Sequence, residues 1–502
     1  MIWLINHLVS LILFTPLLAA LILLVIPERR VGALRCAALI GSLIPLGLAL
    51  FAWSRFDSAS AVYQLTEQVP WYISLNASYH VGVDGISLTL VLLTVFLMPL
   101  AILTSFTITE RVRTYMVLFM ILETAMLGVF VSLDLLLFFV FWEVGLVPMY
   151  FLIAQWGGKN CNYASLKFIL FTMGGSLGLL LATQMMGMLT GSFDLVELGS
   201  RWLALDQASL FGLPLATVKA IAFWAFVIAF AVKVPVWPFH TWLPDAHTEA
   251  PTAGSMILAG VLLKLGAYGF IRLVLPLFPA EARAFAPWLA VLAVAAVVLG
   301  ALGAWGQSDF KRLVAYSSIN HMGFVVLAVA AAGAAVGTPD AHIALNGAVL
   351  QMVAHGLSSA GMFFLVGAIY ERTHTRELGE LGGLYAKLPV YGFVLTFIAM
   401  ASLGLPGLAG FAAEFQIVRG TWPIFMAGTA IALVGLFFTG AYILKALKLT
   451  LHGPLAERWQ KLTDLNVREL IVVSPLMALS LWIGIWPAGI MNLFNLTVAA
   501  LF

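Results

Sequence analysis

Two lysines stand alone inside runs of apolar residues that are long enough to cross a membrane. Lys233 lies in FWAFVIAFAVKVPVWP, and Lys264 lies in SMILAGVLLKLGAYGF. An ammonium group at mid-membrane costs at least about 3 kcal/mol and is retained mainly where it faces a hydrated interior lined by protein. A chain that carries two such groups is therefore predicted to move charge across a membrane.

A carboxylate in a similar setting supplies a possible partner for the first lysine. Glu143 lies in LLLFFVFWEVGLVPMY and needs a cation, because an unpaired charge in hydrocarbon becomes neutral. We expect Lys233 to be that cation. Opening such a pair destabilises the ammonium and releases its proton, so the pair is predicted to act as a switch. A purely structural ion pair is the alternative. Lys264 has no carboxylate nearby in the sequence and is predicted to be a relay site.

Two histidines and a second glutamate extend this set. Histidine side chains in general titrate near physiological pH and can continue a proton path through bound water, which makes His321 and His355 further path candidates. Glu414 would then be a terminal proton donor or acceptor. Serine or asparagine side chains lie close to both histidines in the sequence, so a structural role with satisfied hydrogen bonds is an equal alternative for each.

Four further ionisable residues suggest simpler roles. Glu123 is predicted to pack between helices or face a loop, although it is kept as a further path candidate. Asp134 precedes an apolar run and is predicted to cap a helix. The spacing of His240 and His247, near the inner surface, allows a metal site, but an ordered loop is the simpler interpretation and no metal is predicted.

The surrounding sequence predicts an all-α polytopic membrane protein. Of its 502 residues, 62% are hydrophobic and 10% are charged, and several stretches exceed the roughly 20 residues that span a bilayer as a helix. The first stretch has no basic region before it and no small-residue cleavage site after it, so it is predicted to be a retained span. Hydropathy predicts about fourteen spans: 4–26, 33–53, 86–108, 114–132, 134–155, 164–190, 220–242, 251–275, 284–305, 312–334, 342–370, 391–418, 426–450 and 470–499. The segment 54–85 is predicted to be an interfacial loop.

The seventh and twelfth spans are predicted to be broken helices. Lys233 is followed by Pro235 and Pro238, each of which removes a backbone donor. The twelfth span contains SLGLPGLAGF, in which the helix-breaking residues are Gly404, Pro406 and Gly407. Non-helical backbone at membrane depth survives only where it is buried or lines a wet cavity. Two interrupted spans that are five apart have opposite orientations, as an inverted five-span repeat requires.

The basic residues predict the orientation of the chain. Of the 25 Lys and Arg residues, 17 fall in loops on one side of the predicted spans and 6 on the other, and the remaining two are the lysines within spans. Basic loops face the cytoplasm. Both termini are therefore predicted to lie on the outer side.

Several kinds of chemistry find no support in the sequence. Cys36 and Cys161 are the only cysteines and cannot form a four-thiolate iron–sulfur site. No glycine-rich dinucleotide motif follows a strand, and no Walker loop is present. We expect the chain to bind no nucleotide, flavin or metal. The net charge of +2 gives no indication of nucleic-acid binding.

The motifs around these residues resemble a known family, the antiporter-like membrane subunits of respiratory complex I. The resemblance covers nearly the whole chain and rests on LFFVFWE, PMY, AVKVPVWPFHTWLPDAHTEAPT, LLKLGAYG and SSINHMG. The glutamate in GFAAEF, the loop YHVGVDGISL and the chain length are similar to the M type, the counterpart of mitochondrial subunit 4. The L and N types usually carry lysine at the position of Glu414.

This resemblance implies a specific architecture and set of roles. It implies fourteen helices, with spans 4–8 and 9–13 as inverted repeats. The corresponding division is an N-terminal segment 1–110, repeats at 111–275 and 276–450, and a C-terminal segment 451–502. It assigns Glu143 and Lys233 as a coupled pair, Lys264 as the central relay and Glu414 as the exit-side group.

The resemblance also implies where the chain works and with what. It implies a proton-translocating subunit of NADH:quinone oxidoreductase in a bacterial inner membrane, with L- and N-type subunits as neighbours. NADH, FMN, iron–sulfur clusters and quinone are expected in partner subunits. The alternatives are a subunit of a multisubunit sodium/proton antiporter and a subunit of a ferredoxin- or hydrogenase-linked relative. A substrate permease is disfavoured, since the buried polar groups are titratable residues.

Overall fold

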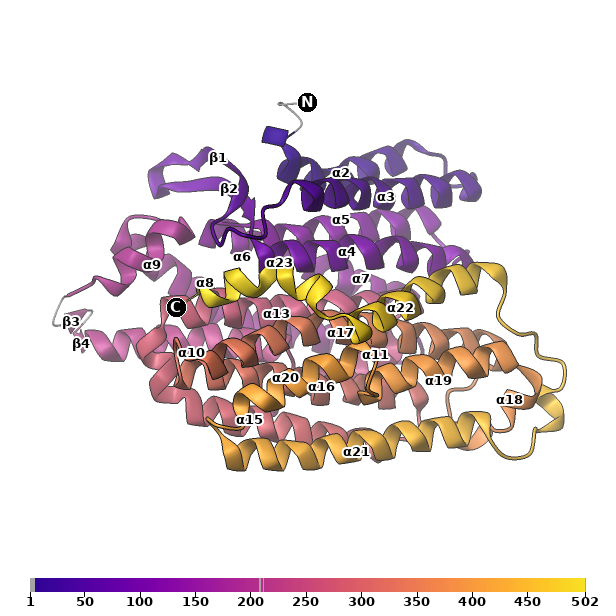
Figure 1. Ribbon diagram of the computed structural model, residues 1–502. Coiled ribbons are helices and arrows are strands. Elements are labelled where there is room, and N and C mark those ends of the chain that lie inside the picture. Colours follow the sequence, from indigo (N-terminus) through magenta and orange to yellow (C-terminus); the bar gives the residue numbers. More distant parts are fainter. Residues whose placement is uncertain (1–4, 207–208, 211, 502) are drawn as a thin grey trace.

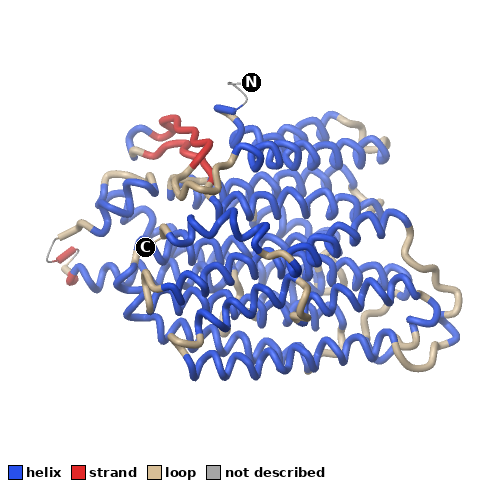
Figure 2. The backbone as a smooth tube through the Cα atoms, viewed as in Figure 1, coloured by secondary structure: helices blue, strands red, loops and turns tan. Residues whose placement is uncertain are grey.

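The computed structural model describes residues 5–206, 209–210 and 212–501 of the chain. It is a bundle of helices, most of which run along one common direction (Figure 1). Helix accounts for most of the drawn backbone, and strands are confined to one end of the bundle (Figure 2). The all-α prediction is confirmed.

The N-terminal half begins with three long helices and continues to a short helix after Lys233. Its helices are α2 (Leu8–Val25), α3 (Val31–Arg55), α4 (Gly85–Thr104), α5 (Val112–Val131), α6 (Leu135–Val144), α7 (Leu146–Trp156), α8 (Cys161–Thr190), α9 (Leu195–Leu203), α10 (Leu215–Lys233) and α11 (Trp242–Glu249). The next span is a composite of α12 (Thr252–Ile257), the π-helical turn η3 (Leu258–Leu262), α13 (Leu263–Gly269), the π-helical turn η4 (Phe270–Val274) and α14 (Leu275–Leu277).

The C-terminal half contains the longest helices. Its α-helices are α15 (Pro279–Trp305), α16 (Phe310–Ala334), α17 (Pro339–Thr373), α18 (Leu384–Lys387), α19 (Pro389–Leu403), α20 (Ala409–Thr421), α21 (Met426–Leu451), α22 (Val467–Ile485) and α23 (Ala488–Ala499). Short 3-10 turns are η1 (Ile73–Leu75), η2 (Ser105–Thr107), η5 (Leu378–Glu380) and η6 (Glu457–Trp459).

The helices agree with the predicted spans at all but a few places. Thirteen helical segments of the described chain are long and apolar enough to cross a membrane, one for each predicted span except the twelfth. The twelfth is divided between α19 and α20. The seventh was predicted to reach residue 242, but its helix stops at Lys233 because two prolines follow. The last span is two helices, α22 and α23, that meet at Pro487.

The predicted interfacial loop contains a β-hairpin. Strands β1 (Gln64–Tyr72) and β2 (Ala77–Val83) pair antiparallel, and a second, very short pair is β3 (Ser209–Leu210) with β4 (Leu213–Pro214). His80 Nδ1 lies 2.7 Å from Asp194 Oδ2, which ties the hairpin to the start of α9. Burial alone would raise the pKa of the Asp194 carboxyl, but hydrogen bonding and charge from His80, with backbone amides, hold that pKa below its usual range.

The helices separate into enclosed and peripheral sets. The composite span α12–α14 and helices α16 and α17 are buried almost along their whole length, whereas α3, α8 and α22 expose many apolar side chains. Exposed apolar residues on such helices are suited to contact with lipid. The enclosed helices carry Lys264, His321 and His355. The division of the chain into two five-span repeats stays a prediction.

Some basic residues that were counted in loops lie inside the bundle. Lys167 is in α8, Lys311 is buried in α16, and Arg272 is within η4. Arg272 forms an ion pair with Asp84, the residue that caps α4, and its guanidinium lies 4.5 Å from the ring centroid of Tyr63. The pairing with a carboxylate and an aromatic face is what allows this arginine to be buried.

Candidate functional site

Both predicted helix breaks are present. Helix α10 ends at Lys233, and the chain continues without helix through Pro235 and Pro238 until α11 begins at Trp242. The Trp242 indole N–H donates to the Val232 carbonyl across the break, at 2.8 Å. This hydrogen bond satisfies one of the carbonyls that the end of α10 leaves free.

The second break creates space for a carboxylate. Helix α19 ends at Leu403, and the next residue, Gly404, has a φ of 86°, while Gly407 has a φ of 92°; these left-handed conformations favour glycine. Pro406 lies between the two glycines. A Cβ atom on Gly404 would lie only 3.0 Å from Oε2 of Glu414, which is on α20. The break therefore allows the Glu414 carboxylate to pack directly against the end of α19.

Lys233 is buried beside an aromatic ring and separated from its expected partner. Its ammonium lies 4.9 Å from the ring centroid of Trp142 and forms no hydrogen bond with the described residues. Glu143 follows Trp142 on α6 and is partly exposed, and its charge interacts with Lys233 at a distance. The two residues are not in ion-pair contact, so the predicted closed pair is not what the structure contains. Instead, the indole face supplies part of the attraction for the ammonium.

Lys264 lies between two π-helical turns. The preceding turn, η3, contains Ala259, whose carbonyl accepts a hydrogen bond from the Lys264 ammonium. The same ammonium lies 2.7 Å from Nδ1 of His355 on α17. π-Helical turns are often found at functional sites. Here the turn adjoins a buried lysine and turns a backbone carbonyl toward it.

Lys264, His355, His321 and Glu414 form one continuous line. The rings of His355 and His321 have centroids 5.6 Å apart. His321 Nδ1 lies 2.9 Å from Oε1 of Glu414, and its Nε2 lies 3.3 Å from the Ser402 hydroxyl. All five side chains are buried. The structure thus brings together four residues that the sequence placed in four different spans.

Lys233 connects to this line through helix packing. Gly266, one half-turn after Lys264, lies against the end of α10, and a Cβ atom on it would come within 3.1 Å of the Lys233 Cβ. The absence of a side chain at Gly266 lets the two helices approach this closely. The end of α10 is therefore packed directly against the helix that carries Lys264.

Glu123 is separate from this line. It is fully buried in α5, and both carboxylate oxygens lack a hydrogen-bond partner among the residues that the structure describes. Its expected position between packed helices agrees with this burial. Asp134 caps α6 as predicted, since its Oδ1 accepts from the backbone N–H groups of Leu136 and Leu137 at 2.9 and 3.0 Å.

The structure adds residues that the sequence did not single out. Gln351 is buried on α17 and donates to Oε1 of Glu414 at 3.1 Å. It precedes His355 by one helical turn, a spacing that places both on one helix face and could have identified it. Ser402, which contacts His321, lies just before the second break. The position of Ser402 next to that break in the sequence could have identified it as a site residue.

His247 was expected near the inner surface but is fully buried. Its ring stacks on Phe363, with centroids 4.4 Å apart, and neither ring nitrogen has a hydrogen-bond partner among the described residues. Helix α11 packs against α8 and α16, which encloses one face of the helix. Over the described ranges, no group of three or more His, Cys, Asp or Glu residues is arranged to hold a metal ion.

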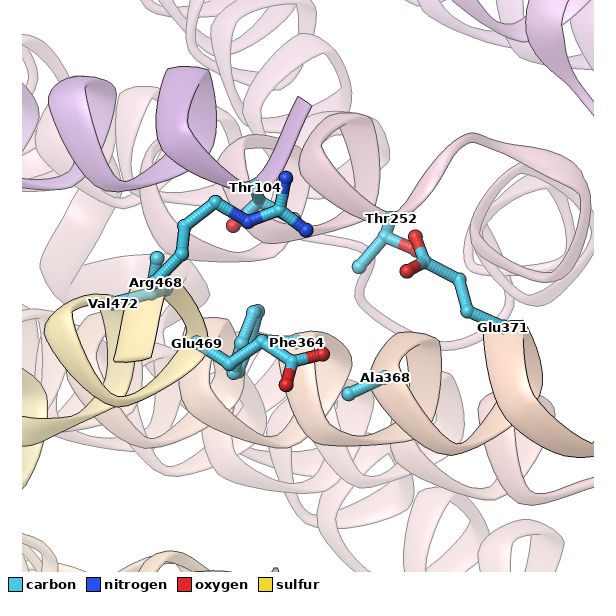
Figure 3. Close-up of a pocket in the computed structure, with 8 residues that line it drawn as sticks. All are labelled: Thr104, Thr252, Phe364, Ala368, Glu371, Arg468, Glu469 and Val472. Atoms are coloured by element: carbon cyan, nitrogen blue, oxygen red, sulfur yellow. The ribbon is translucent and has the colours of Figure 1, made fainter. Parts of the chain in front are cut away.

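A second cluster of polar side chains lies at the end of the bundle opposite the hairpin. Arg372 of α17 pairs with Glu469 of α22, with its two terminal nitrogens 2.8 and 2.6 Å from the carboxylate oxygens. Figure 3 shows Arg468 and Glu371 on either side of the small cavity beside this pair. The bidentate geometry anchors α22 to the enclosed helix α17. Arg372 lies on the same helix as His355, but more than four turns further along it.

Comparison with protein families gives two consecutive matches. Residues 48–130 match the family of the NADH-ubiquinone oxidoreductase chain 4 amino terminus, and residues 132–442 match the family of NADH:quinone oxidoreductase/Mrp antiporter membrane segments. The chain is 40% identical to NADH-quinone oxidoreductase subunit M of Rhodobacter capsulatus, covering 99% of this chain and 96% of that protein.

Solved structures agree with this relationship. A chain of respiratory complex I from Thermus thermophilus is 27% identical, covers 98% of both chains and superposes with a TM-score of 0.87. A chain of the Mrp complex from a Dietzia species has the same fold with a TM-score of 0.80 at 24% identity. It matches over 98% of this chain but only 51% of its own length.

Proposed function

The chain belongs to the M-subunit family of NADH-quinone oxidoreductases, and we propose that it translocates protons across the membrane within such a complex. The observation that carries this proposal is the row of buried titratable groups from Lys264 to Glu414, with two close polar contacts and one pair of neighbouring histidine rings. Each neighbouring pair in it can exchange a proton directly or through one water molecule. A line of this kind moves protons and has no place for a larger substrate.

The central step transfers a proton from Lys264 to Glu414. The Lys264 ammonium donates to His355 Nδ1 over 2.7 Å, and the proton then passes to His321 across the gap between the two rings. His321 hands it to the carboxylate of Glu414 over 2.9 Å. Glu414 packs against Gly404 at the second helix break, so movement of that break controls release.

Lys233 and Glu143 control the start of this transfer. When Glu143 approaches Lys233, it stabilises the ammonium; when the two separate, the buried ammonium loses its proton more readily. The separated arrangement in the structure corresponds to the second condition. Because Gly266 holds the Lys233 and Lys264 helices together, a change in the charge of one lysine alters the field at the other.

The redox chemistry belongs to other subunits in this proposal. NADH, FMN, iron–sulfur clusters and quinone are bound by partner chains, and this chain itself binds none of them. Its neighbours in the membrane are the L- and N-type subunits. The chain lies in a bacterial inner membrane with both termini on the periplasmic side, as favoured by the 17 basic residues in or next to the loops of one side of the predicted spans, against 6 on the other.

The proposal is tested by replacing lysines of one helix. Lys233→Ala is expected to lower quinone-coupled proton translocation by about tenfold or more, because the switch loses its cation. Lys219→Ala, at the other end of α10, is the matched control and should leave translocation unchanged. Both are measured in vesicles that contain the purified complex, with NADH oxidation by an artificial acceptor as the test of an intact peripheral arm.

Two results would contradict the proposal. One is normal proton translocation in Lys233→Ala and also in Lys264→Ala. The other is a purified complex without flavin and iron–sulfur subunits, whose loss impairs sodium tolerance and leaves NADH oxidation untouched. That second result would favour the sodium/proton antiporter alternative.

A further inference from the structure

The carbonyl groups at the end of α11 accept hydrogen bonds from four different parts of the chain. The four carbonyls at a helix C-terminus lack intrahelical partners and need other donors when they are buried. Their donors here are the Ser255 hydroxyl to His247, the Arg376 guanidinium to Thr248, the Gly158 backbone N–H to Glu249 and the Lys311 ammonium to Ala250. The first three distances are 3.1, 2.6 and 2.9 Å.

The two charged donors come from the C-terminal half of the chain. Lys311 is in the first turn of α16 and is buried, and Arg376 follows α17. Arg376 is oriented by an ion pair with Asp309 at 3.1 Å, and its own carbonyl accepts from the N–H of Phe310 at 2.8 Å. The cations therefore form one unit with the start of α16. Positive charge at a helix C-terminus also complements the helix dipole.

The other end of α11 holds the end of α10. Trp242, the first residue of α11, is fully buried and donates its indole N–H to the carbonyl of Val232, the residue before Lys233. The eight residues of α11 make a rod about 12 Å long. One end is held by cations of the C-terminal half, and the other end holds the backbone next to Lys233.

We propose that Lys311 and Arg376 are positioning residues that act through α11 and Trp242 to set the place of Lys233. The expected change in proton translocation rests on the proposed function. The expected change in amide hydrogen exchange in α11 does not. Helix α11 is then a strut between the two halves of the molecule. A displacement of the start of α16 then moves α11 and, with it, the end of α10, so that both parts of the broken seventh span move together.

The test removes a donor at each end of the strut. Lys311→Met keeps the length of the side chain but leaves the Ala250 carbonyl without its donor. We expect amide hydrogen exchange in α11 to quicken by about tenfold or more, the factor that corresponds to one lost hydrogen bond from a charged donor. Proton translocation should fall while oxidation of NADH by an artificial acceptor is unchanged. Lys311→Arg, which retains a donor, should restore both.

A double-variant cycle separates a strut from two unrelated contacts. Trp242→Phe removes the hydrogen bond at the other end of α11. If both contacts act through α11, the double variant Trp242→Phe, Lys311→Met should translocate protons nearly as fast as Trp242→Phe alone. Lys445→Met is the control, because it removes an ammonium from the carbonyls of Trp305 and Gln307 at the end of α15, and it should leave exchange in α11 unchanged. If Lys311→Met does not assemble, Ser255→Ala removes a neutral donor from the same end and should give a smaller increase in exchange.

Three outcomes would overturn the proposal. They are unchanged exchange in α11 in both Lys311→Met and Ser255→Ala, independent and multiplicative losses in the double variant, and a failure of Lys311→Arg to restore translocation. Faster exchange in α11 with normal translocation in Lys233→Ala would instead contradict the proposed function and leave the strut in place.

Discussion

At the residue scale, Glu414 is held by side chains from two enclosed helices. Its Oε1 accepts contacts from His321 of α16 and Gln351 of α17, and its Oε2 faces Gly404. A buried carboxylate needs such donors, because an ionised group without them is strongly destabilised. The amide of Gln351 does not titrate and cannot relay a proton, so its role is to stabilise the charge of Glu414.

Replacing Gln351 tests this role. Gln351→Leu removes the amide donor and keeps a similar volume, and we expect coupled proton translocation to fall by roughly tenfold, as for one lost hydrogen bond to a charged group. The rate is measured in vesicles with the purified complex. Gln416→Leu is the control, since Gln416 of α20 contacts Met491 instead of the buried line. Equal rates in Gln351→Leu and the unsubstituted complex would exclude the role.

The sequence predicted the members of the buried line but not all of their contacts. Lys264, His321, His355 and Glu414 stood out because ionisable groups in apolar spans are costly. Lys233 and Glu143 were identified for the same reason, but their separation depends on side-chain positions that spacing does not determine. Gln351 and Ser402 are neutral polar residues, which enter membrane helices at lower cost and therefore give a weaker signal.

At the element scale, the close contact between α10 and α13 requires a glycine at position 266. A Cβ atom at Gly266 would lie 2.8 Å from a methyl carbon of Val234 and 2.9 Å from the carbonyl oxygen of Phe230. These distances are well below ordinary van der Waals contact, and a backbone oxygen cannot move aside cheaply. A side chain at position 266 would therefore force the two lysine-bearing helices apart.

Gly266→Ala should separate these helices. We expect overpacking to destabilise the complex by about 1–3 kcal/mol and to lower proton translocation, because the contact between the Lys233 and Lys264 helices is lost. Retention of assembled complex after heating and the translocation rate are the two measurements. Gly174→Ala is the matched control, since nothing lies within 4 Å of the Cβ that it adds on α8. Equal behaviour of the two variants would show that the close approach has no consequence.

The elements themselves were predictable to different degrees. Thirteen spans were read from hydropathy because a bilayer demands long apolar helices. Both helix breaks were signalled by proline and glycine in apolar surroundings. The hairpin β1–β2 was missed, since the turn at residues 73–76 contains neither glycine nor proline, the strongest of the usual turn signals. The depth of α11 was also missed, because its polar sequence resembles a surface loop.

At the scale of the whole molecule, the enclosed and peripheral helices have separate tasks. Helices α16 and α17 and the composite span α12–α14 bring the titratable groups together, and the apolar faces of α3, α8 and α22 isolate them from polar surroundings. The hairpin lies at one end of the bundle, and the loop between α21 and α22 lies at the other (Figure 1). The direction of proton movement thus depends on which end faces the cytoplasm.

The orientation is tested by labelling the two ends. In a Cys36→Ser, Cys161→Ser background, Ile73→Cys places a thiol at the hairpin tip, where the native side chain is 84% exposed. Lys461→Cys places one in the opposite loop. Because basic residues cluster at the loops of that opposite end, we expect a membrane-impermeant maleimide added to intact cells to label position 73 and to spare position 461.

The reverse pattern would place the termini in the cytoplasm and invert the proposed path. Permeabilised cells serve as the control, since both thiols should then react. If position 73 is covered by a partner subunit, Val62→Cys offers a second thiol at the same end, where the native side chain is 68% exposed. Labelling of position 461 in intact cells with neither hairpin-end thiol labelled would contradict the orientation, and with it the assignment of Glu414 to the outer exit.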